Sequence, residues 1–234
     1  HQVVGRGSRR PDRQPADSVN DTELAQQIAE TAGRMLVELR SSGLFAGKEL
    51  GQAGDELANA FIMRALRRNR PDDAILSEEE RDNSARLAAS RVWIVDPLDG
   101  TREYGEARAD WAVHVALAID GTATLGAVAL PGLPLTLTSA DALSRPHHAG
   151  KLRMLVSRTR PAAEAVAVAE ALGAELVPMG SAGAKAMAIV LGEAKNVEKA
   201  FRLKVESDEI SSRTAFFGAS FGSGAALGSF VGSV

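Results

Sequence analysis

Cysteine is absent from this chain of 234 residues, and aromatic side chains are scarce: one Tyr, two Trp and seven Phe. Without cysteine there is no disulfide framework, no thiolate nucleophile and no zinc site built on cysteine. Four histidines are too few and too scattered for a histidine-rich metal site, so any metal should be a hard cation held by carboxylates. A formal net charge of −3 gives no excess of Lys and Arg for binding nucleic acid.

The overall composition is that of a globular protein. Apolar residues make up 45% of the chain and charged residues 24%, which allows a substantial core and excludes disorder, a collagen-like fibre or a coiled coil for most of it. The length suits one large domain or two small ones. No internal repeat or Gly/Ser linker divides the middle, and we expect a cytoplasmic location.

Both ends of the chain differ in composition from the middle. Residues 1–16 are rich in Arg, Gly and Pro without hydrophobic periodicity, which predicts a disordered leader. Residues 214–234 carry no charge, and Gly and Ser fill nine of these 21 positions. Their length and small-xxx-small spacing would suit a membrane span. So much Gly and Ser makes the segment only weakly hydrophobic, however, so we favour a floppy or strand-forming end.

The middle of the chain alternates helix and strand patterns. Asn20 and Glu23 form a capping box ahead of apolar residues at helical spacing. Asp120-Gly121 separates two apolar runs as a type I′ hairpin turn would. The other expected elements are a helix over 54–68, strands over 74–76, 92–95, 111–119, 122–130, 152–156 and 176–179, a helix over 161–172 capped by Gly173, and a helix that begins at Ser181. This alternation predicts an α/β fold of stacked helix and sheet layers.

The most informative segment is residues 92–101, V-W-I-V-D-P-L-D-G-T. A buried strand delivers Asp96 at its end, Pro97 prevents further ladder pairing and redirects the chain, and Asp99 follows. Two carboxylates this close repel each other unless a cation lies between them. The backbone amides of the next two residues would suit a phosphate at the same place.

A second acidic group, Glu78–Glu80, follows another short apolar run. One Glu and two Asp, with a backbone carbonyl, form an oxygen cage suited to Mg²⁺. Acidic loops after strands are common, and either segment alone would more often be a solvated helix start or a turn. Because both occur at strand ends of one α/β unit, we predict a metal site. His114 lies in an alternating strand and is expected to be a packed histidine rather than a catalyst.

Three segments together resemble the inositol monophosphatase superfamily of Mg²⁺-dependent, lithium-sensitive phosphatases: S-E-E at 77–79, D-P-L-D-G-T at 96–101 and G-S-A-G-A-K at 180–185. R-E-Y at 102–104 and S-R-T-R at 157–160 are similar to stretches of its 3′(2′),5′-bisphosphate nucleotidase branch, the CysQ type. The resemblance implies an αβαβα sandwich and a single phosphatase domain.

The resemblance also implies roles for individual residues. Mg²⁺ would be held by Glu78, Asp96, the Leu98 carbonyl and Asp99. Asp55 would pair with Thr101 and, together with Glu78, serve catalysis by activating water. The positions that match substrate contacts are Leu98, Asp99, Gly100, Thr101, Ser157, Arg160, Ser181 and Lys185. Arg160 stands where the family often has His.

One feature of the family is missing from the sequence. A Trp-Asp pair is expected about 26 residues after the Ser of G-S, where its Asp completes a second metal site. The two tryptophans are Trp93 and Trp111, and neither lies there. Asp208 or Glu206 would be the substitute, but the surrounding residues do not match and we do not favour either. We therefore divide the chain into a leader at 1–16, a phosphatase domain at 17–194 and a divergent or aberrant segment at 195–234.

The resemblance implies a phosphomonoesterase that removes the 3′-phosphate of 3′-phosphoadenosine 5′-phosphate with two or three Mg²⁺ ions and activated water, in the setting of sulfate assimilation. Three alternatives stay open: an inositol-1-phosphate phosphatase, a fructose-1,6-bisphosphate phosphatase, and a non-catalytic relative with an incomplete second metal site. The expected partner is a small phosphorylated nucleotide, with no nucleic acid and no membrane. Homodimerisation is left open.

Overall fold

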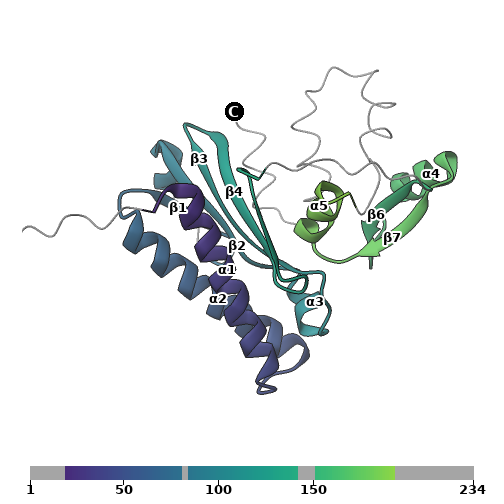
Figure 1. The fold of residues 1–234 in the computed structure, drawn as a ribbon, viewed down its shortest axis with the longest axis horizontal. Coiled ribbons are helices and arrows are strands. Elements are labelled where there is room, and N and C mark those ends of the chain that lie inside the picture. The colour runs from purple at the N-terminus through teal and green to yellow at the C-terminus, as the bar shows by residue number, and fades with distance from the viewer. Residues whose placement is uncertain (1–18, 81–83, 142–150, 193–234) are drawn as a thin grey trace, which may run out of the picture.

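The computed structural model describes residues 19–80, 84–141 and 151–192. The leader at 1–16, the segment at 195–234 and the candidate substitutes Asp208 and Glu206 all lie outside these ranges. Five helices, one short 3-10 helix and seven strands occupy the described residues (Figure 1). No helix in those ranges is both long and apolar enough to cross a membrane.

Two long helices open the fold. Helix α1, Asp21–Ser41, begins at the predicted capping box, in which the Asn20 side chain accepts from the Glu23 amide and the Glu23 carboxylate accepts from the Asn20 amide. Helix α2, Gly47–Asn69, begins seven residues before the predicted start at Gly54. Its N-cap, Ala46, makes no side-chain cap, so the sequence carries no start signal there.

Both helices pack against one five-stranded sheet (Figure 1). Its order is β1 (Ala74–Ser77), β2 (Arg91–Asp99), β3 (Ala112–Ile119), β4 (Thr122–Leu130) and β5 (Leu135–Thr138). Only the β1–β2 pair is parallel. The turn between β3 and β4 has positive φ at Asp120 and Gly121, 49° and 75°, as type I′ geometry requires. Strand β5 and the 3-10 helix Ser84–Ala88 were not predicted.

The second half forms a smaller unit beside the sheet. Strands β6 (Arg153–Ser157) and β7 (Glu175–Met179) pair in parallel, and α4 (Ala163–Leu172) packs on them. Gly173 ends α4 with φ 61°, the predicted left-handed cap. Helix α5 (Ala182–Val190) begins at the predicted N-cap Ser181 and contacts β3 and β4. The layers are therefore α1/α2, the large sheet, α5, the small sheet and α4, which confirms the expected αβαβα order (Figure 1).

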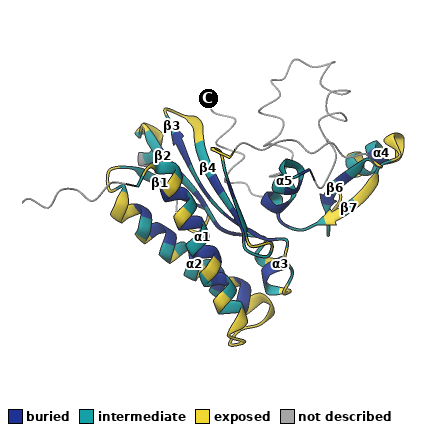
Figure 2. Ribbon diagram, in the orientation of Figure 1, coloured by how far each residue is buried: buried dark blue, intermediate teal, exposed yellow. Residues whose placement is uncertain are grey.

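The main core lies between α1, α2 and the large sheet, where buried residues line the facing sides (Figure 2). Trp93, Tyr104 and Trp111 are fully buried. The Tyr104 and Trp111 rings meet edge to face at 5.0 Å, and the Arg40 guanidinium lies over both. Short α3, Thr101–Gly105, follows β2 and packs against α2. This packing fixes α2 and α3 beside the end of β2, where the acidic residues gather.

Candidate active site

The acidic segment at the end of β2 interrupts the sheet. Asp96 pairs with His114 of β3, the next registered pair is Asp99 with Ala112, and the register shifts between them. Pro97 lies in this interval and has no N–H to donate to the ladder. Strand β2 nevertheless runs through Pro97 to Asp99, so the prediction that Pro97 ends the ladder pairing is wrong. The predicted redirection of the chain is confirmed, since the shift brings Asp99 toward Asp96.

Glu78 reaches the same place from the neighbouring strand. In the parallel β1–β2 pair, Ser77 registers with Val95, and the Glu78 amide donates to the Val95 carbonyl at 3.3 Å. The charge of Glu78 also contributes to raising the pKa of Asp96, so the two carboxyl groups lie near each other. The two motifs that the sequence places after separate strands therefore meet at one end of the sheet.

Asp55 comes from α2 and pairs with Thr101. The Thr101 hydroxyl lies 3.1 Å from Oδ2 of Asp55 and 3.0 Å from the Leu98 carbonyl. A hydroxyl carries one hydrogen, so it donates to one of these acceptors at a time. A Cβ on Gly51 of α2 would lie only 2.9 Å from Cγ2 of Thr101, so close packing of α2 on α3 sets the distance.

Burial and mutual repulsion dominate the electrostatics of this cluster. Burial, together with the charges of Asp99, Glu78 and Asp55, raises the pKa of Asp96 to about 8, although His114 opposes the shift. Burial and the nearby Glu79 raise the pKa of Asp55 to about 7. Burial and Glu79 also raise the pKa of Glu78. Asp55 and Asp96 therefore hold protons near neutral pH, chiefly because they are buried.

Asp99 behaves in the opposite way because the N-terminal end of α5 lies against it. The Ser181 hydroxyl donates to Oδ2 of Asp99 at 2.6 Å, the Gly183 amide donates to the same oxygen, and the Ala182 amide donates to Oδ1 at 3.3 Å. Burial would raise the pKa of Asp99, but bonds from His114, Ser181 and Gly183 outweigh it and lower that pKa to about 2. Asp99 is therefore a permanent carboxylate.

This donor set fits a divalent cation. Ligand atoms of Asp96, Asp99 and His114 lie within 4.8 Å of one another, and Glu78 is near enough for its charge to raise the pKa of Asp96. Burial raises the pKa of Asp96 first and the neighbouring carboxylates raise it further, and a bound cation would oppose both effects by favouring the charged form. Carboxylate and carbonyl oxygens are the ligands that Mg²⁺ prefers, so Glu78, Asp96, Asp99 and the Leu98 carbonyl are the residues that would hold it.

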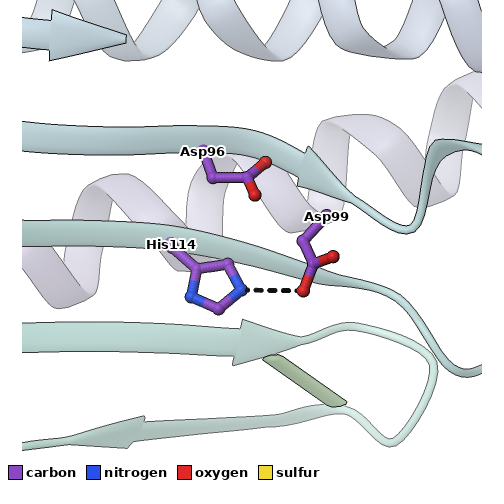
Figure 3. Close-up of side chains that lie close together, drawn as sticks. All are labelled: Asp96, Asp99 and His114. Carbon is purple, nitrogen blue, oxygen red and sulfur yellow. Dashed lines mark hydrogen bonds and ion pairs between the residues drawn. The ribbon is translucent and has the colours of Figure 1, made fainter. Parts of the chain in front are cut away.

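His114 is a member of the cluster that the sequence analysis missed. Its Nε2 lies 3.3 Å from Oδ2 of Asp99 (Figure 3), and this contact raises the pKa of the imidazole against the opposing effect of burial. The expectation of a packed histidine did not include this contact with Asp99. The alternation of β3 places His114 on one face of its strand, but the sequence does not say which residue of β2 lies opposite. Only the strand register shows that His114 lies opposite Asp96.

The predicted substrate residues fall into two groups. Ser181 and Gly100 lie against the acidic cluster, since a Cβ on Gly100 would touch the Ser181 Cβ at 3.0 Å. Lys185 folds back and donates to the carbonyls of Met179, Gly180 and Ser181. Ser157 and Arg160 lie at the end of β6, where the Ser157 hydroxyl accepts from the Arg160 amide at 3.3 Å. Their roles toward substrate stay predictions.

Two further ionic groups hold the parts of the site together. Arg158 donates to the buried Glu103 of α3 at 2.8 Å and to Glu106 at 2.7 Å, which ties β6 to α3. Asp110 accepts from Arg108 and, at 2.7 Å, from the Gly180 amide. The sequence analysis assigned no role to Arg158 or Asp110, because both act through contacts between distant segments.

Comparison with known proteins places this geometry in a recognised group. The model of the inositol monophosphatase family matches residues 19–190. A Mycobacterium leprae protein named 3′-phosphoadenosine 5′-phosphate phosphatase is 44% identical over 190 residues, which cover 75% of this chain and 70% of that protein. A Mycobacterium bovis protein of the same name is 43% identical over 172 residues, 69% of this chain and 64% of its own length.

The solved structure of CysQ from Bacteroides thetaiotaomicron, a bacterial member of the inositol monophosphatase family, matches with a TM-score of 0.64. It is 20% identical, and the match covers 75% of this chain and 78% of that one. An inositol monophosphatase from Staphylococcus aureus matches with a TM-score of 0.59 at 18% identity, over 73% of this chain and 71% of that one. At such identities the likeness supports the fold.

Proposed function

This chain belongs to the inositol monophosphatase family, and on that premise we propose that it removes the 3′-phosphate of 3′-phosphoadenosine 5′-phosphate in a Mg²⁺-dependent reaction. The names of relatives at 43–44% identity support the substrate. The structural observation that carries the proposal is the meeting of Asp96 and Asp99 at the end of β2, beside the Asp55–Thr101 pair and next to the strand end that carries Glu78.

Hydrolysis adds water across the phosphorus–oxygen bond of the ester. A proton must leave the attacking water, and the departing 3′ oxygen must gain one. When bound, Mg²⁺ would neutralise charge on the phosphate and make water more acidic. Because phosphate monoesters are very slow to hydrolyse unaided, this charge neutralisation is the main contribution that the site has to make.

The protein's own groups have two tasks in this scheme. Thr101, held between Asp55 and the Leu98 carbonyl, would orient the attacking water, and Asp55 would take up its proton. A pKa of about 7 suits Asp55 to exchange protons near neutral pH. The backbone amides of Gly100 and Thr101 would donate to the phosphate oxygens.

A second candidate function is binding of phosphorylated ligands without turnover. The observation that favours it is the occupation of Asp99 by the Ser181 hydroxyl and the α5 amides. Neither tryptophan of the chain is followed by Asp, so the family's Trp-Asp ligand has no counterpart in the sequence. In this case a metal and phosphate would bind, but the ester would not be cleaved.

Release of inorganic phosphate separates these candidates. The full chain is incubated with Mg²⁺ and, in turn, 3′-phosphoadenosine 5′-phosphate, inositol 1-phosphate and fructose 1,6-bisphosphate. We expect release from the nucleotide, inhibition by Li⁺, and loss of turnover in Asp96→Asn but not in Asp120→Asn. Asp120 is a matched acidic control because it lies in the turn at the far end of β3. Binding of the nucleotide without phosphate release would favour the second candidate.

The proposal includes a cytoplasmic location and Mg²⁺ as the working ion. Replacement of Mg²⁺ by Ca²⁺ is expected to abolish turnover, because the larger ion accepts looser coordination. Light scattering on the purified chain tests whether it forms a homodimer.

A further inference from the structure

The side chains of Asp96, Asp99 and His114 converge beside the large sheet (Figure 3). One ligand atom from each lies within 4.8 Å of the other two. Asp96 and His114 are register partners on β2 and β3, and the register shift after Asp96 brings in Asp99. An imidazole therefore stands where two carboxylates would share a cation.

We propose that His114 is a nitrogen ligand of the cation position shared by Asp96 and Asp99. The inference rests on the proposed function in one respect, that a divalent cation binds at this acidic cluster. It goes further in assigning to that position a mixed oxygen and nitrogen ligand set. Imidazole is an ordinary ligand of zinc, cobalt and other first-row metals, whereas Mg²⁺ prefers oxygen.

The protein groups available at this position favour His114 as a ligand. Asp96 and Asp99 provide two ligands, and Glu78 approaches Asp96 from the side of β1. His114 lies on β3, on the other side of β2. A third protein ligand on that side therefore comes most directly from the imidazole, whose Nε2 is 3.3 Å from Asp99.

Helix α5 fixes the two groups that would act together. A Cβ on Gly183 would overlap the Cε1 and Nε2 atoms of His114 and approach Oδ2 of Asp99, so α5 packs directly on the imidazole edge. Oδ2 of Asp99 receives bonds from Ser181 and Gly183, while Oδ1 receives a 3.3 Å bond from Ala182. Oδ1 is thus the more available oxygen for a cation, and the surrounding contacts hold it in place.

The competing explanation is that His114 is only a positively charged partner of Asp99. In that case the imidazole would keep both nitrogens protonated and could not bind metal. The two explanations differ in one observable, which is whether a nitrogen atom is bonded to the metal ion.

Pulsed electron paramagnetic resonance on the full chain loaded with Mn²⁺ measures this directly. A nitrogen bonded to Mn²⁺ gives a ¹⁴N coupling of the imidazole type. We expect this coupling in the wild type and its loss in His114→Asn. The matched control is the double variant His147→Gln, His148→Gln, which removes two other imidazoles and should keep the signal.

Each outcome has a defined meaning. Bound Mn²⁺ without ¹⁴N coupling in the wild type would overturn the assignment of His114 and leave the proposed function standing. Coupling that persists in folded His114→Asn would overturn it as well. Failure to bind Mn²⁺ at all would overturn the proposed function together with this inference.

A second measurement is independent of the spectroscopy. Competition calorimetry gives the affinity of the chain for Zn²⁺ relative to Mg²⁺. We expect His114→Asn to lower this ratio on the order of tenfold or more, the scale at which groups supporting a metal site change its affinity. An unchanged ratio would contradict nitrogen ligation. If His114→Asn does not fold, His114→Gln and the wild-type spectrum decide the question.

Discussion

Asp55 on α2 and Thr101 at the start of α3 lie 3.1 Å apart between Oδ2 and Oγ1, although 46 residues separate them in sequence. Gly51, one helical turn before Asp55, leaves room for Thr101, since a Cβ there would lie 2.9 Å from Cγ2 of Thr101. The packing of α2 on α3 therefore sets the geometry of this pair, which lies beside the acidic cluster and outside the proposed set of metal ligands.

Asp55→Asn should abolish most turnover and leave metal binding nearly intact. The amide keeps the shape of the side chain but cannot accept a proton, and loss of a general base costs roughly 10²–10⁴-fold in rate. Steady-state phosphate release and calorimetric titration with Mg²⁺ measure the two effects separately.

Glu56→Gln is the matched control for this substitution. Glu56 is the next residue on α2 and its carboxylate accepts only from Gln52 among its described hydrogen bonds, at 3.0 Å. The rate of phosphate release by Glu56→Gln should stay near that of the wild type. If Glu56→Gln and Asp55→Asn lost the same share of this rate, charge on α2, rather than the Asp55–Thr101 pair, would support the reaction.

The metal-free protein should lose stability as pH rises from about 5 to about 8. Asp96 has a pKa of about 8 in the fold against 3.8 when unperturbed, so the folded state binds its proton more tightly than the unfolded state does. That stabilisation is complete below about 3.8 and is lost as pH rises toward 8. Asp55, with a pKa of about 7, changes stability in the same direction, as does His114, whose pKa is also raised.

Asp99 does not offset this loss in the same window. Its pKa is lowered to about 2, so its stabilisation is present above about 3.8 and is lost only toward pH 2. Since one pKa unit corresponds to about 1.4 kcal/mol, we expect a fall on the order of a few kcal/mol in the free energy of unfolding.

Urea denaturation in EDTA at several pH values checks this prediction. Mg²⁺ should restore stability more at pH 8 than at pH 5, and Asp96→Asn should flatten the dependence because it removes the charge. A metal-free protein that becomes more stable between pH 5 and pH 8 would contradict a raised pKa for Asp96.

Local chemistry was enough to predict much of this molecule. The capping box at Asn20, the left-handed cap at Gly173 and the type I′ turn at Asp120-Gly121 each depend on neighbouring residues, and all three are confirmed. The meeting of Glu78 with Asp96 also followed, because strands that run in parallel bring their ends to the same edge.

The missed features depend on contacts between segments that are distant in sequence. Helix α2 begins at Gly47 without a side-chain cap, so no local pattern marks its start. His114 joins the cluster through strand register, and Arg158 reaches Glu103 across 55 positions. A sequence pattern fixes which face a residue lies on, but not which partner lies opposite.

Arg158→Ala should destabilise the protein more than Arg160→Ala. Arg158 is bonded to the buried carboxylate of Glu103, and its removal leaves that group without this partner, at a cost of about 1–3 kcal/mol. Arg160 is exposed, so its replacement should leave the urea midpoint within experimental error.

Kinetics on the same two variants test their expected roles. If Arg160 contacts the nucleotide, Arg160→Ala raises KM for 3′-phosphoadenosine 5′-phosphate with little effect on stability. A raised KM in Arg158→Ala with an unchanged urea midpoint would instead assign the substrate contact to Arg158.

Gly183→Ala should weaken the docking of α5 on the acidic cluster. An added Cβ would overlap the imidazole of His114 and press on Asp99, and overpacking of this kind costs about 1–3 kcal/mol. The higher helix propensity of Ala offsets at most about 1 kcal/mol of this cost, so we expect a net decrease in the free energy of unfolding.

Gly126→Ala is the matched control, because its Cβ would lie 3.6 Å from the Cβ of Ala116, in ordinary contact. The urea midpoint and the rate of phosphate release should both be lower than wild type in Gly183→Ala and should stay near wild type in Gly126→Ala. A Gly183→Ala protein with full stability and turnover would mean that α5 does not press on His114 and Asp99 in solution.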